Sequence, residues 1–145
     1  MRLLHEHNEI VRREKGLHRG YEVKTIGDAF MLAFQSARDA LRCAIGIQRA
    51  LAKRNETAKV PIRVRIGLHT GELVHEGGDF LGRHASFAAR VASKAKAGEI
   101  VVSPLLREVV AASGEFAFEG RKAEALRGFK GKYKLNSVCW SDVEV

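Results

Sequence analysis

The 145-residue chain has only two cysteines, two prolines and one tryptophan, and no hydrophobic run near the roughly 20 residues that cross a bilayer. Because it also begins without a signal peptide, we expect a cytoplasmic protein with no transmembrane segment in this chain. Cys43 and Cys139 lack metal-ligand spacing, so we expect buried, reduced thiols rather than a disulfide. The six histidines are scattered and form no zinc-like pair.

Acidic residues are fewer than basic ones: 17 Asp and Glu stand against 25 Lys and Arg, giving a formal net charge of +8. The basic residues are spread along the chain without interleaved aromatic side chains, which disfavours a nucleic-acid-binding surface. We therefore expect no nucleic-acid partner and a solvated basic surface, part of which a polyphosphate substrate would use. A basic α+β domain that contacts nucleic acid is kept as a minor alternative.

The chain is long enough for one domain with a sizeable core. Hydrophobic periodicity predicts helices at residues 1–15, 37–53, 83–94 and after Ser103-Pro104, and strands at residues 21–26, 30–34, 62–68, 71–75 and 100–102. The strands at 62–68 and 71–75 are expected to pair, and three short strands are expected within residues 116–140. This order predicts an α+β fold, a ferredoxin-like layered α/β sandwich.

Helix ends have recognisable signals. Gly16 or Gly20 is expected to end the first helix. Ser36 and Asp39 resemble a capping box, with Ser36 as N-cap and the Asp39 side chain reaching back. Ser103 followed by proline predicts a further N-terminus.

The most informative segment is an apolar hairpin with Gly27-Asp28 at its tip. Residues 21–26 alternate as a half-buried strand does, whereas residues 30–34 form an unbroken apolar run typical of a buried one. Glycine and aspartate tolerate the positive φ angles of tight hairpin turns. Asp28 is thus a single carboxylate at an apolar tip, either a local backbone acceptor or a metal ligand.

Two further motifs follow the hairpin in order. The hairpin motif is Lys24-Thr25-Ile26-Gly27-Asp28-Ala29-Phe30, and the later ones are Arg65-Ile66-Gly67-Leu68-His69-Thr70-Gly71-Glu72 and Asp79-Phe80-Leu81-Gly82-Arg83-His84-Ala85-Ser86-Phe87-Ala88-Ala89-Arg90. Together they resemble the catalytic domain of bacterial class III nucleotidyl cyclases, which carries K-T-x-G-D-G-F, R-I-G-L-H-T-G-E and D-x-x-G-x-x-V-N-x-A-A-R in this order. The resemblance covers about residues 7–103 and weakens over 104–145.

The resemblance implies a single cyclase homology domain over residues 1–145, with the ferredoxin-like α/β sandwich of that family. It implies conversion of ATP to 3′,5′-cyclic AMP and pyrophosphate at a homodimer interface, in cyclic-nucleotide signal transduction. Two Mg²⁺ or Mn²⁺ ions are expected in the intact family site, where they lower the pKa of the ribose 3′-hydroxyl and neutralise the developing charge.

The resemblance also assigns residues. Asp28 matches a metal ligand, and Arg90 matches the arginine that stabilises the phosphates in the transition state. Lys24 and Asp79 match the two positions that select the purine. An ammonium can donate to adenine N1 and a carboxylate can accept from its 6-amino group, so this pair resembles adenylate rather than guanylate cyclases. Ser86 stands where the family has a ribose-orienting asparagine.

Three departures from the family pattern support an alternative. Ser86 is shorter than asparagine, and Ala29 replaces the glycine after the hairpin aspartate. The resemblance begins inside the helix that follows the family's first strand, so that strand and its metal-binding aspartate have no counterpart. We expect a chain lacking its first strand, inactive as residues 1–145 alone and possessing fused regulatory domains if it belongs to a longer protein. The alternative is a degenerate, non-catalytic cyclase-like module that binds nucleotide or dimerises.

Overall fold

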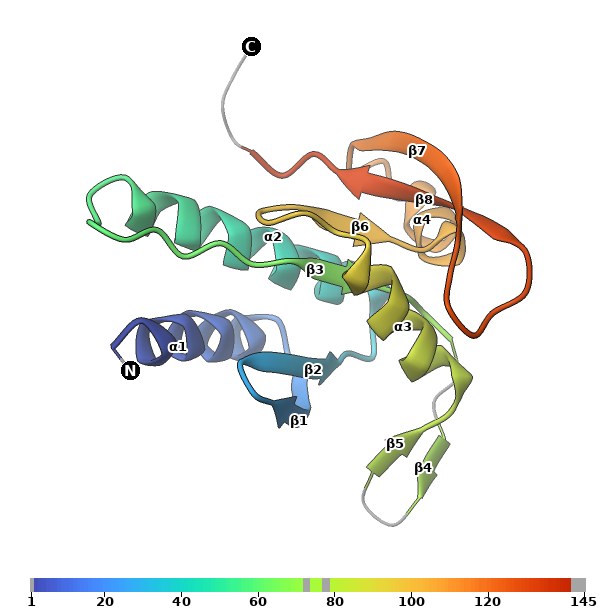
Figure 1. Ribbon diagram of the computed structural model, residues 1–145, viewed down its shortest axis with the longest axis horizontal. Helices are drawn as coiled ribbons and strands as arrows, with labels where there is room; N and C mark the ends of the chain where they lie inside the picture. The colour runs from blue at the N-terminus through green and yellow to red at the C-terminus, as the bar shows by residue number, and fades with distance from the viewer. Residues whose placement is uncertain (1, 72–73, 77–78, 142–145) are drawn as a thin grey trace. The chain divides into compact units, whose positions relative to one another are not determined.

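The computed structural model describes residues 2–71, 74–76 and 79–141, with the backbone alone described for residues 74–76 and 79–81 (Figure 1). The chain divides into two compact units, Met1–Arg63 with Ser141–Val145 and Val64–Trp140, and each is described by itself. The expectation of a single cyclase domain stays a prediction. Among the described helices, none has the length and apolar character needed to cross a membrane.

The first unit contains two helices and a hairpin. Its elements are α1 (Arg2–Leu17), β1 (Tyr21–Ile26), β2 (Ala29–Ala33) and α2 (Ala37–Asn55). The hairpin is confirmed: β1 and β2 pair antiparallel up to Ile26 and Ala29, and Gly27 takes a φ of 62° in the turn between them. Strand β2 is half-buried along most of its length rather than fully buried, so its apolar run overstated its burial.

Helix α1 ends in a Schellman motif. The N–H of Gly20 donates to the Lys15 carbonyl at 2.8 Å, and the N–H of Arg19 donates to the Gly16 carbonyl at 3.4 Å. Arg19, and neither of the two glycines expected to end the helix, takes the left-handed conformation, with a φ of 60°. That conformation costs a non-glycine residue about 1–2 kcal/mol. Arg19 offsets part of this cost by donating to the Asp39 carboxylate at 3.0 Å.

Helix α2 begins at the expected N-cap. The Ser36 hydroxyl accepts the backbone N–H of Asp39 at 3.2 Å. The Asp39 side chain does not complete the expected capping box. Its carboxylate instead forms ion pairs with Arg19 at 3.0 Å and with Arg42 at 3.5 Å. Asp39 therefore links the end of α1 to the first turn of α2.

The second unit is built on a mixed sheet. Its strands are β3 (Ile66–Leu68), β6 (Ile100–Val102), β8 (Lys132–Val138) and β7 (Phe118–Ala125), adjacent in that order. Strands β3 and β6 are parallel, and the other pairs are antiparallel. The remaining elements are β4 (Val74–Glu76), β5 (Asp79–Leu81), α3 (Arg83–Ser93) and α4 (Pro104–Ala111).

Three strand predictions for this unit differ from the structure in extent, pairing or number. The strand expected over residues 62–68 begins only at Ile66, because its described ladder partner β6 is three residues long. In the segment expected to pair with it, the described residues 74–76 pair instead with 79–81 as a separate hairpin, β4–β5, and residues 72–73 lie outside the described ones. The tail has two strands instead of three, since residues 118–125 continue through a register shift after Gly120.

The two cysteines are free, but only one is buried. Burial, and to a lesser degree the charge of Glu14, raises the pKa of the Cys43 thiol to about 12. Cys139 is exposed, contrary to the expectation from sequence. It follows the buried Val138 directly, and successive side chains of an extended segment point to opposite faces.

Helix α3 packs closely on β3. A Cβ atom added at Gly67 would lie 2.3 Å from the Ala92 Cα, so only glycine permits this approach. The helix adds Phe87 and Val91 to a buried cluster with Ala95, Val101, Leu126 and Leu135. The close approach at Gly67 thus determines where α3 lies against the sheet.

We predict that Gly67→Ala destabilises the protein by about 1–3 kcal/mol, the usual cost of forcing extra volume into a packed core. The matched control is Gly16→Ala in α1, where an added Cβ meets nothing within 4 Å. That control should be neutral or stabilising by about 0.5 kcal/mol, because alanine favours helix. Urea unfolding midpoints measure both; equal midpoints for the two variants would contradict the tight packing.

Candidate functional site

In the first unit, Lys24 and Asp28 lie on the same hairpin and both are exposed. Lys24 pairs with Met31 directly after a bulge in β1, and Asp28 occupies the turn. Within the part of the chain that the structure describes, the Asp28 carboxylate makes no hydrogen bond or ion pair. Its oxygens therefore face solvent, and no described residue occupies them, so they can serve as metal ligands.

Side chains attach this hairpin to α1. The Arg12 guanidinium donates to both carboxylate oxygens of Glu22, from Nε at 3.0 Å and from Nη2 at 3.2 Å. It also lies over the Phe30 ring, 5.0 Å from the centroid. The hydrogen bond raises the pKa of Arg12 and lowers that of Glu22. Fork geometry and ring stacking both suit arginine, so this contact orients the strands that lead to the Gly27-Asp28 turn.

The donor chemistry at Asp28 fits a hard divalent cation in part. Carboxylate oxygens are the preferred protein ligands of Mg²⁺, which typically takes one or two of them and fills its other positions with water or phosphate. Among the described residues, no group of three or more His, Cys, Asp or Glu could hold a metal ion. Asp28 thus supplies one ligand, and a bound nucleotide would have to contribute others.

In the second unit, Ser86 and Arg90 lie four residues apart on α3 and therefore share a helix face. Ser86 is exposed and Arg90 is half-buried. No described residue forms a hydrogen bond or ion pair with the Arg90 guanidinium. Asp79 opens β5, where its backbone pairs with that of Glu76; its side chain is outside the described residues. The five residues named from sequence are thus divided between the two units.

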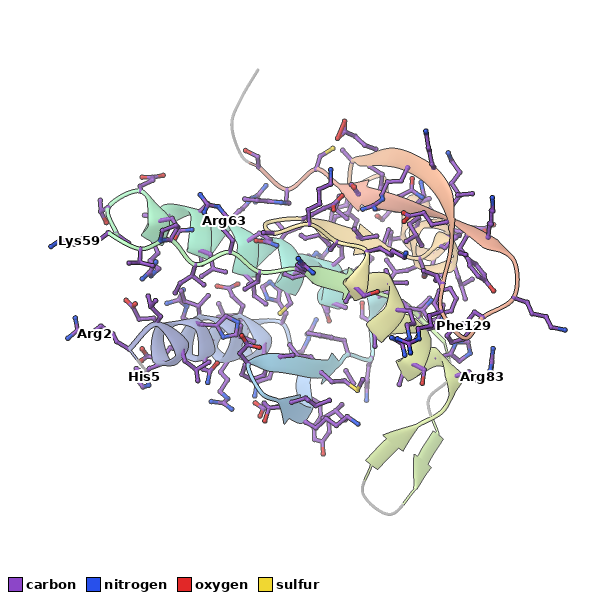
Figure 2. The ribbon with its side chains drawn as sticks, in the orientation of Figure 1. Arg2, His5, Lys59, Arg63, Arg83 and Phe129 are labelled. Atoms are coloured by element: carbon purple, nitrogen blue, oxygen red, sulfur yellow. The ribbon has the colours of Figure 1, made fainter. Side chains whose placement is uncertain are left out.

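The first turn of α3 is held against the β7–β8 connection. The Arg83 guanidinium lies over the Phe129 ring at 4.5 Å from the centroid, and Figure 2 shows the two side chains together near the start of the helix. Phe87 meets Phe129 and Tyr133 edge-on, at 4.9 Å and 5.0 Å between centroids. These contacts fix the helix from which Ser86 and Arg90 project.

Sequence reasoning missed a chain of hydrogen bonds in this unit. His69 Nε2 lies 3.0 Å from His84 Nδ1, and His69 Nδ1 lies 2.6 Å from the Ser103 hydroxyl. The histidines are far apart in sequence, which hid their pairing. A signal was present, because His69 directly follows β3, His84 lies in the first turn of α3 and Ser103 is the N-cap of α4. The ends of parallel neighbours meet at one sheet edge.

Burial, followed by the nearby His84, lowers the pKa of His69 from its ordinary value of 6.5 to about 4. The folded protein therefore keeps His69 neutral at acidity where the unfolded chain binds a proton. Since the unfolded state then binds more protons, lower pH favours unfolding.

We predict that the free energy of unfolding falls as the pH decreases from 6.5 towards 4, with His69 contributing part of the slope. His69→Gln removes the titrating group and should flatten this part of the profile. Denaturant unfolding at several pH values measures both slopes. Identical slopes for the variant and the wild type would show that His69 titrates alike in the folded and unfolded states.

Comparison with known proteins gives consistent matches. Residues 1–140 match the family described as adenylate and guanylate cyclase catalytic domain. The chain is 35% identical over 122 residues to an adenylate cyclase of Lachancea kluyveri, covering 67% of this chain and 7% of that protein. It is 31% identical over 104 residues to putative adenylate cyclase 3 of Rhizobium meliloti (strain 1021), covering 70% of this chain and 18% of that protein.

A solved structure supports the same family. The adenylate/guanylate cyclase/hydrolase of Silicibacter pomeroyi matches with a TM-score of 0.86 and 27% identity, covering 98% of this chain and 85% of that chain. The α+β fold expected from sequence, of the class III cyclase type, is thereby confirmed. The chain spans only a small part, 7% and 18%, of the two curated relatives described above.

Proposed function

Because the chain belongs to the family of adenylate and guanylate cyclase catalytic domains, we propose that it is an adenylate-type cyclase domain that converts ATP to 3′,5′-cyclic AMP. The observation that carries the proposal is Asp28, an exposed carboxylate without a described partner at the tip of a hairpin inside the matched region. Both curated relatives compared above carry the name adenylate cyclase, one of them as putative, which supports the choice of base.

Lys24 and Asp79 would read the adenine base. The Lys24 ammonium projects from an exposed strand position and can donate to adenine N1. The Asp79 carboxylate can accept from the 6-amino group. Guanine presents an acceptor where adenine has the amino group and a donor at N1, so the same pair would meet it with mismatched groups.

Arg90 and Ser86 would act on the phosphates and the ribose. The reaction joins the ribose 3′-oxygen to the α-phosphorus, breaks the bond to the β-phosphate bridge, and releases pyrophosphate and one proton. A guanidinium without a described protein partner can donate two parallel hydrogen bonds to the phosphate oxygens as their charge develops. Ser86, one turn earlier on the same face, would hold the ribose by its hydroxyl.

Asp28 would hold Mg²⁺ or Mn²⁺ together with phosphate oxygens of the substrate and a second carboxylate. Such ions, when bound, lower the pKa of the ribose 3′-hydroxyl and neutralise phosphate charge. The proposed assembly is a homodimer in which Asp28 of one subunit and Arg90 of its partner share a site, serving cyclic-nucleotide signalling.

The mixing of two inactive variants tests the shared site. Arg90→Ala should lower cyclic AMP formation by roughly 10³-fold, the lower end of the effect of a transition-state arginine on phosphoryl transfer. Asp28→Asn should also lower it strongly, because it removes the proposed metal ligand. Mixed in equal amounts, they should regain about a quarter of wild-type activity, because half the dimers carry one intact site out of two. The assay uses the protein from its full reading frame with Mn²⁺ and ATP; heterodimers that form but stay inactive contradict shared sites.

Base selection is tested by Lys24→Glu combined with Asp79→Cys. The exchange reverses the donor and acceptor pattern presented to the purine, so the preference for ATP over GTP should fall by roughly 10²-fold or more. Relative kcat/KM values for the two nucleotides measure it. Unchanged preference would remove both residues from base recognition.

A non-catalytic, nucleotide-binding module remains the second candidate. It is favoured by Ser86 and Ala29, which depart from the family motif. Nucleotide binding without any cyclic AMP formation, in the full reading frame with Mn²⁺, would select it over the cyclase.

A further inference from the structure

The segments before and after the β4–β5 hairpin are in contact through a pair of histidines. His69 lies before the hairpin and His84 after it, and their facing ring nitrogens are 3.0 Å apart. Gly71 packs on the same ring, since a Cβ atom added there would lie 2.4 Å from His84 Cγ. The chain leaving β3 and the chain entering α3 are therefore in direct contact at the base of the hairpin.

His69 is itself fixed on its other side. Its Nδ1 meets the hydroxyl of Ser103, which is fully buried, at 2.6 Å. That hydroxyl also accepts the Leu106 N–H at 3.2 Å as the N-cap of α4. The His69 ring packs on Phe87 with centroids 4.5 Å apart. The pair is thus anchored to the end of β6, to α4 and to α3.

Only histidine serves both partners of position 69. A neutral imidazole presents two ring nitrogens on opposite sides, one a donor and one an acceptor, so it bridges Ser103 and His84 at once. An asparagine at position 69 can place its amide only where Nδ1 meets Ser103, and a glutamine only where Nε2 meets His84. At position 84 the described contact uses Nδ1, which an asparagine amide can replace.

We propose that His69 and His84 are positioning residues for base recognition, holding the β4–β5 hairpin that carries Asp79 in a fixed position relative to α3. A two-stranded hairpin is marginally stable by itself, and its described pairing comprises three residue pairs, so a contact at its base determines where it lies. The inference rests on the proposed role of Asp79 and deepens it: purine selection depends on two residues that need not touch the purine.

The first measurement follows the hairpin without any nucleotide. His84→Ala should speed backbone hydrogen exchange at β4 and β5 by roughly tenfold, the equivalent of losing one well-made hydrogen bond, and His84→Asn should restore slow exchange. The ¹⁵N spectrum of the His69 imidazole should lose its fixed tautomer in His84→Ala and recover it in His84→Asn. The control is Arg107→Ala in α4, which removes a side chain that lies over the Phe118 ring at 5.3 Å from the centroid and should leave β4–β5 exchange unchanged.

The second measurement is binding of the α,β-methylene analogues of ATP and GTP with Mn²⁺. His84→Ala should weaken the ATP analogue roughly tenfold and change the GTP analogue far less, and His84→Asn should approach wild type. Unchanged exchange in His84→Ala overturns the inference, as does equal weakening of both nucleotides. If the wild-type protein binds neither analogue, the proposed function fails, whereas a retained ATP preference in His84→Ala overturns this inference alone.

Discussion

Glu99 contacts three strands of the sheet in residues 64–140 and directly precedes the fourth, β6; its carboxylate contacts β7 and β8, and its backbone carbonyl contacts β3. The carboxylate accepts hydrogen bonds from the Lys96 N–H at 2.8 Å, from Arg121 of β7 at 2.9 Å and from the Ser137 hydroxyl of β8. The backbone carbonyl of the same residue accepts the Ile66 N–H of β3 at 3.1 Å, directly before β6 begins. Burial would raise the pKa of Glu99, but the hydrogen bonds and the Arg121 charge outweigh it and lower that pKa. Glu99 thus adds hydrogen bonds to β3, β7 and β8 beside the short backbone ladder between β3 and β6.

Both hairpins that carry proposed nucleotide-contacting residues lie outside this sheet and form two-stranded sheets of their own. Isolated hairpins are marginally stable, so their positions depend on side-chain contacts with helices. Arg12 makes that contact for β1–β2, through Glu22 and Phe30. His69 and His84 make it for β4–β5. The position of each hairpin therefore depends on a contact made by residues other than those proposed to bind the substrate.

The sequence was sufficient wherever the determining interaction is local. The Gly27-Asp28 turn and the N-caps Ser36 and Ser103 were predicted correctly, because a turn or a cap depends on residues within three or four positions. The positions of Asp28 and Arg90 on a hairpin tip and a helix also agree with the sequence pattern, whereas their roles remain predictions.

What the sequence did not reveal depends on distant partners. Arg19 adopts a left-handed conformation although two glycines are nearby, and it is paired with Asp39 on another helix. The pairing of Val74–Glu76 is different, because both of its possible neighbours are close in sequence and periodicity alone does not distinguish them. The contact between His69 and His84 appears only once β3 and α3 are packed together.

The contrast between the two cysteines gives the protein a natural attachment point. A thiol reacts with electrophiles as its thiolate, and the buried Cys43, whose pKa lies near 12, holds almost none of that form at neutral pH. Cys139 is exposed at the end of β8. A maleimide dye or spin label added to the unmodified chain would therefore mark one position in the second unit, without engineered cysteines and without disturbing Cys43.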